Sequence, residues 1–147
     1  NKQEEMSKNL ERYSLYEAYE VRQVLETKAM DLIVRNATDA DLDEIEAAYQ
    51  TMLCRFAETN TTMGEFELHQ LYAKKTGSVF MEQTLNIVLS TILEMMHTTS
   101  HSVLDMHQVE EEKTDHQRII RALQNRDTNE AQRAMFDHIQ HTLDILN

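Results

Sequence analysis

The chain has no proline and only two glycines, Gly64 and Gly77, among its 147 residues. Proline and glycine mark most hairpins and tight turns, so a sheet of several short strands would be hard to connect with this composition. Leu, Met, Glu, Gln and Ala, which favour helices or fit them well, are abundant instead. The sequence therefore predicts an all-α fold.

Apolar residues recur at spacings of three and four along most of the chain, which is the period of a helix with one buried face. The last helix is expected to open at Asp127, where Glu130 follows three residues later as in a capping box. We expect about six helices, over residues 15–33, 42–56, 66–73 and 79–97, then one ending near 125 and one opening at 127. They should pack as an antiparallel bundle around a metal or effector cavity.

The charge and the length of the chain limit its function and its surroundings. A formal net charge of −12 argues against binding to nucleic acid, which depends largely on Lys and Arg. The single Cys54 cannot form an internal disulfide, and the most apolar stretch, residues 87–93, is too short to cross a membrane. We expect a cytoplasmic domain over residues 13–147, preceded by a linker remnant over the polar residues 1–12.

Four side chains are candidates to bind a metal ion. Glu65 and His69 lie four residues apart on a predicted helix and therefore share a face. His116 and His138 lie at core positions eleven residues before and after Asp127, so an antiparallel hairpin can bring them opposite one another. A carboxylate and three imidazoles suit a divalent Zn, Ni, Mn or Fe ion. Buried histidines are also common as hydrogen-bonded core residues, and the residue pattern leaves both interpretations open.

Arg22 is a further candidate, because it lies in the middle of the apolar stripe of the first helix. A buried guanidinium needs a partner, which could be an internal carboxylate or the carboxylate of a small organic acid. The pattern does not choose between the two. The acidic run of residues 110–112 is interpreted as a solvated helix face.

Several segments, in order, resemble the FadR C-terminal domain, the FCD effector-binding module of GntR-type regulators. They are residues 19–26 (YEVRQVLE), 65–69 (EFELH), 116–123 (HQRIIRAL) and 135–138 (MFDH). In the family, an Asp lies four residues before the first metal-binding His. Here Glu65 takes the place of that Asp, four residues before His69. No single motif is specific, but their order and spacing match over about residues 13–145.

The resemblance implies that Glu65, His69, His116 and His138 bind one divalent ion, Zn in the first place, and that Arg22 faces the effector cavity. It also implies a homodimer that binds a small carboxylate or sugar acid and is not an enzyme. In such a regulator a winged-helix domain binds DNA, and we expect that domain upstream in the parent protein.

Two other functions remain open. An all-α metal-dependent enzyme could use three histidines and a carboxylate around an open coordination position. However, phosphohydrolases of the HD type need His followed by Asp, whereas this chain has Asp115 before His116 and Asp137 before His138, and it lacks the repeated Glu-x-x-His of di-iron bundles. A metal-free helical interaction module with structural histidines is the second alternative.

Overall fold

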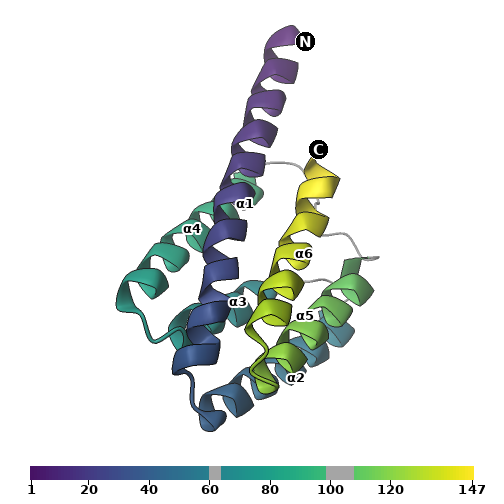
Figure 1. Cartoon of the computed structure of the whole chain (residues 1–147). Helices are drawn as coiled ribbons and strands as arrows, with labels where there is room; N and C mark the ends of the chain where they lie inside the picture. Colours follow the sequence, from purple (N-terminus) through teal and green to yellow (C-terminus); the bar gives the residue numbers. More distant parts are fainter. Residues whose placement is uncertain (60–63, 99–107) are drawn as a thin grey trace.

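The computed structural model describes residues 1–59, 64–98 and 108–147, without the side chains of residues 7–12, 97, 98 and 108. These residues form six helices and no strand, which confirms the predicted all-α class. The helices, shown in Figure 1, are α1 (Lys2–Asn36), α2 (Asp39–Thr59), α3 (Glu65–Lys75), α4 (Val79–Thr98), α5 (Gln108–Gln124) and α6 (Thr128–Leu146).

The longest helix, α1, organises the bundle and contacts α3, α4, α5 and α6. α6 runs antiparallel beside α1, and α5 in turn runs antiparallel to α6 (Figure 1). α1 begins at Lys2, earlier than the apolar stripe that starts at Leu15 predicts, because Asn1 and Glu4 form a capping box there. The N-terminal turns of α1 extend past the rest of the bundle, as Figure 1 shows.

A large apolar core joins all six helices, and Ala29, Ala73 and Leu85 form a smaller cluster of their own. The buried members of the large core include Leu15, Met30 and Ile33 of α1, Ile45 and Phe56 of α2, Leu68 and Tyr72 of α3, Ile92 of α4, Ile119 of α5, and Met135 of α6. The polar residues that interrupt this core lie on α1, α3, α5 and α6, where those helices meet. Within the described residues, no helix is both long and apolar enough to cross a membrane.

The turn between α5 and α6 sets the register of the hairpin on which two of the candidate histidines lie. Arg126 has a left-handed φ of 52°, and its N–H donates to the Leu123 carbonyl while the N–H of Asp127 donates to the Ala122 carbonyl. This is a Schellman arrangement, which satisfies the last carbonyls of α5 and reverses the chain within a few residues.

The capping box predicted at the start of α6 forms only in part. Asp127 accepts a hydrogen bond from the N–H of Glu130 at 3.1 Å, as predicted. The Glu130 carboxylate accepts from Arg118 Nε at 2.7 Å instead of returning to Asp127. The reciprocal bond is missing because the Asp127 N–H already donates to the Ala122 carbonyl at the C-terminus of α5.

Replacement of Asp127 by Ala should lower the free energy of unfolding by about 1 kcal/mol, because one N–H at the start of α6 loses its acceptor. Asp127→Asn keeps an acceptor oxygen and should stay within a few tenths of a kcal/mol of the parent chain. Urea unfolding followed by circular dichroism measures both variants. Equal destabilisation by Asn and Ala would show that the side-chain cap does not stabilise the hairpin.

Candidate metal centre

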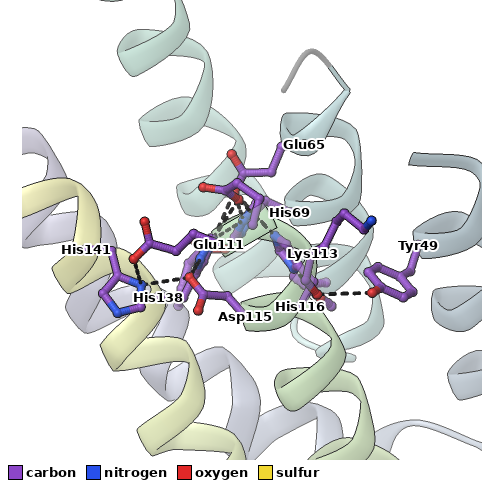
Figure 2. Close-up of polar contacts among 12 residues, drawn as sticks. Tyr49, Glu65, His69, Glu111, Lys113, Asp115, His116, His138 and His141 are labelled. Carbon is purple, nitrogen blue, oxygen red and sulfur yellow. Dashed lines mark hydrogen bonds and ion pairs between the residues drawn. The ribbon is translucent and has the colours of Figure 1, made fainter. Parts of the chain in front are cut away.

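The structure brings the four predicted residues together inside the bundle. Glu65 Oε1 lies 2.6 Å from His69 Nε2, 2.9 Å from His138 Nε2 and 3.4 Å from His116 Nε2. Each of the four side chains is buried, and one potential ligand atom from each lies within 4.8 Å of the others. Figure 2 shows the histidines directed at the Glu65 carboxylate from α3, α5 and α6.

The short helix α3 supplies two of the four groups. Gly64, with a φ of 100°, precedes α3, and Gly77, with a φ of 71°, follows it, so both turns use a conformation that glycine tolerates best. Acidic residues in the first turn and lysines in the last complement the helix dipole. The buried face of α3 carries Glu65 and His69 one turn apart, which orients both toward the bundle centre.

The α5–α6 hairpin supplies the other two groups. The rings of His116 and His138 lie with their centroids 4.5 Å apart and their planes at 61°. Both imidazoles are buried among the apolar residues that line the contact between α5 and α6. The hairpin predicted from the equal distance of the two histidines from Asp127 therefore forms and places the edge of one ring against the other.

Two of the histidines are held by a carboxylate at the ring nitrogen that faces away from the centre. Glu26 of α1 lies 2.5 Å from His69 Nδ1, and Asp115 of α5 lies 2.9 Å from His138 Nδ1. A carboxylate at Nδ1 accepts the proton there and leaves the Nε2 lone pair free, which is the tautomer that a metal ligand needs. Burial would raise the pKa of Glu26, but His69 and Arg22 lower it to about 2.

The third histidine has a phenol in the same position. Tyr72 Oη lies 2.9 Å from His116 Nδ1. Burial and the nearby carboxylates raise the pKa of Tyr72 well above its ordinary value, so this group stays a phenol. A phenol oxygen can accept the Nδ1 proton of His116 and so favour the same tautomer as in the other two histidines.

Negative charge is in excess around these groups. Burial would raise the pKa of Glu65, but the His69 imidazole holds that pKa well below its usual range. Burial also disfavours the charged form of His138, but Glu112 and Asp115 raise the pKa of this histidine well above its ordinary value. The carboxylates therefore favour a positive charge at the centre, whether a proton or a metal ion carries it.

Arg22 lies at the edge of the centre and is almost completely buried. Its Nε donates to Glu26 Oε2 at 2.7 Å, so an internal ion pair, one of the two partners predicted for it, does form. Its Nη2 lies 3.8 Å from Glu65 Oε1 and, although buried, donates no hydrogen bond. Because a buried guanidinium N–H without an acceptor is costly, this atom marks a place where an anionic ligand would be stabilised.

The geometry of the four groups fits a single divalent ion. Metal–ligand bonds of about 2.0–2.2 Å place adjacent ligand atoms roughly 3 Å apart. Glu65 Oε1 lies 2.9 and 3.4 Å from Nε2 of His138 and His116, close to this spacing, whereas the 2.6 Å to His69 Nε2 is shorter. Burial, an excess of carboxylate charge, and Nδ1 atoms anchored by acceptors are all features of metal-binding histidines. The effector cavity expected beside this centre stays a prediction.

Sequence reasoning missed several residues of the centre and misplaced one. Glu112 was interpreted as part of a solvated face, but it is buried, and only Glu110 and Glu111 of that run are exposed. A signal for it exists, because Glu112 precedes His116 by four residues, as Glu65 precedes His69. The contact of Asp115 with His138, by contrast, joins two helices, and no spacing within one helix predicts it.

The sequence and the fold of the chain are similar to those of known proteins. The HTH-type transcriptional regulator LutR of Bacillus subtilis (strain 168) is 28% identical to the chain over 133 residues, which cover 87% of this chain and 60% of LutR. The chain thus spans less than two thirds of the length of this relative.

Two solved structures share the fold. Streptococcus agalactiae GntR superposes with a TM-score of 0.73 at 19% identity, over 88% of this chain and 58% of that one. E. coli McbR/YncC gives a TM-score of 0.69 at 15% identity, over 88% of this chain and 62% of that one. The FCD domain family matches residues 17–141, which confirms the resemblance found in the sequence. The chain therefore belongs to the FCD domain family.

Proposed function

We propose that the chain is the effector-sensing domain of a GntR-type transcription regulator and binds one divalent ion, Zn, Ni, Mn or Fe, through Glu65, His69, His116 and His138. The observation that carries the proposal is the convergence of their four ligand atoms, all buried and within 4.8 Å of one another. A bound ion would supply an electrophilic centre that can take an oxygen ligand from a small molecule. The residues around it orient the imidazoles and exclude water.

Arg22 is the second part of the proposed sensor. Its buried Nη2, 3.8 Å from Glu65 Oε1 and without a hydrogen-bond acceptor, can donate to a carboxylate that approaches the same centre. We therefore propose a small organic acid, such as a hydroxy acid or a sugar acid, as the effector. Glu26 holds the guanidinium in place through Nε, so that Arg22 need not reorganise when the acid binds.

The name of LutR, a transcriptional regulator, favours a sensing role over an enzymatic one. In the longer protein that we propose, a separate domain would bind DNA, and the effector would change the DNA affinity by favouring one of two arrangements of the bundle. A homodimer would match the symmetry of a palindromic operator.

The metal content of the chain, purified without chelators, tests the metal site. Elemental mass spectrometry should find about one Zn, Ni, Mn or Fe per chain, and His116→Ala combined with His138→Ala should lose it, because two of the three imidazoles are gone. His141→Ala is the matched control, since this histidine lies one turn further along α6 and is partly exposed.

No bound metal in the parent chain, even after incubation with each ion, would contradict the metal site and favour a metal-free interaction module. Turnover of a candidate acid by the metal-loaded chain would favour the enzyme instead. His141 shares Asp115 Oδ2 with His138, so loss of the metal in the His141→Ala control as well would point to this outer contact or to folding rather than to the four ligands.

Replacement of Arg22 by Lys should weaken binding of the organic acid about tenfold or more, because Lys keeps the charge but loses the planar fork. Thermal shift of the metal-loaded chain against a panel of hydroxy acids, dicarboxylates and sugar acids measures the effect. Arg35→Lys, on the same helix but exposed, is the control. Equal shifts for the parent chain and Arg22→Lys would exclude Arg22 from the effector site.

Exposed apolar side chains support pairing of two copies. Val24 on α1 and Phe80 and Ile87 on α4 are 70%, 81% and 67% exposed, and these two helices pack together. Burial of such side chains is the usual driving force for association. Sedimentation equilibrium should give twice the mass of the chain, and Phe80→Glu should shift the equilibrium toward monomer. A monomer at micromolar concentration would contradict the homodimer.

A further inference from the structure

Glu112 of α5 lies beside the four predicted ligands and, like them, is buried. Its side chain is 8% exposed, and Oε2 lies 3.6 Å from His116 Nε2 and 3.7 Å from His138 Nε2. Those two nitrogens are the atoms through which the histidines face Glu65. Glu112 therefore approaches the same centre through a second carboxylate.

The Oε2 atom of Glu112 is buried but forms no hydrogen bond with any residue that the structure describes. A buried carboxylate oxygen normally accepts hydrogen bonds or coordinates a cation, because the loss of its hydration is otherwise uncompensated. The arrangement of α5 repeats that of α3, since each helix carries a glutamate four residues before a histidine, both on the buried face. Two helices thus each direct a glutamate and a histidine toward this centre, although Glu112 is not one of the four residues whose ligand atoms all lie within 4.8 Å of one another.

We propose that Glu112 is a fifth protein ligand of the metal centre, so that three imidazoles and two carboxylates bind the ion. This inference rests on the proposed metal-binding function. The 3.6 and 3.7 Å separations from the histidine nitrogens exceed hydrogen-bond length and are near the spacing of ligands that share one ion.

The second carboxylate has two consequences for the choice and charge of the ion. Two carboxylate ligands, Glu65 and Glu112, would match the charge of a divalent cation in this buried site. Five protein ligands also exceed the four of a tetrahedral site and leave one position open in a six-coordinate site. Glu112 therefore favours ions that accept six ligands and bind oxygen well, such as Mn²⁺, relative to Zn²⁺.

Metal titration of the chelator-stripped chain tests this assignment. Glu112→Gln should weaken Mn²⁺ binding at least about tenfold, measured from the electron paramagnetic resonance signal of free Mn²⁺, and should weaken Zn²⁺ binding less, measured by competition with a chromophoric chelator. Glu110→Gln is the matched control, because Glu110 lies on the same turn with an exposed side chain. The Glu110→Gln variant should bind both ions as the parent chain does.

Glu112→Asp separates direct coordination from the effect of charge. Aspartate keeps the negative charge but is shorter by one methylene, so a direct ligand loses affinity for Mn²⁺ while a carboxylate that acts only through its charge does not. Circular dichroism and thermal unfolding of the metal-free variants report whether each one folds. Glutamine keeps the shape of the Glu112 side chain, so Glu112→Gln is the variant in which a loss of metal binding is least easily confused with a loss of packing.

The outcomes separate this inference from the proposed function. If the parent chain binds metal and both Glu112 variants bind Mn²⁺ and Zn²⁺ equally well, Glu112 is not a ligand and the four-residue site stands. If Glu112→Gln is weakened but Glu112→Asp is not, Glu112 acts through its charge and direct coordination is wrong. If the parent chain binds neither ion, the metal site itself is overturned.

Discussion

One buried carboxylate, that of Glu65, is the constraint on which the centre of this bundle depends. Its Oε1 contacts Nε2 of His69, His116 and His138, which come from α3, α5 and α6. A carboxylate that is 4% exposed must be offset by positive charge or hydrogen bonds, so these three helices can pack only in an arrangement that directs the imidazoles at it. The apolar core stabilises the bundle, but this polar contact specifies how α3 meets the α5–α6 hairpin.

The polar network extends outward from the centre to α1. Glu26 bonds both His69 and Arg22, so α1 contacts the candidate ligands through two of its own buried residues. One turn away, Gln23 donates to the Phe136 carbonyl and to Gln140 on α6. Because buried networks have few alternative arrangements, a ligand that binds beside Arg22 would act on the contact between α1 and α6. Under the proposed function, this contact is where binding at the centre would alter the shape of the domain.

The same network explains why a bound cation would stabilise the centre. Glu26, Glu65, Glu112 and Asp115 supply carboxylates, and Arg22 offsets only part of their charge. Arg22 Nη2 and Glu112 Oε2 are two of the four buried side-chain atoms that have no hydrogen-bond partner in the described part of the chain, and both lie in this cluster. Unsatisfied atoms of opposite sign at the edges of one buried cluster are expected where a metal ion and an anionic ligand bind, and they are costly in a purely structural core.

The sequence by itself determined the helical class, the approximate helix boundaries and the four candidate ligands, because these depend on composition and on spacing within one helix. The pairing of His116 with His138 also followed, since the position of Asp127 sets the hairpin register. Only the tertiary structure placed Asp115 at His138 and Glu26 at His69, because each of these contacts joins two helices. It also showed that Glu112 is buried, since an acidic run has the same spacing whether it faces solvent or a polar centre.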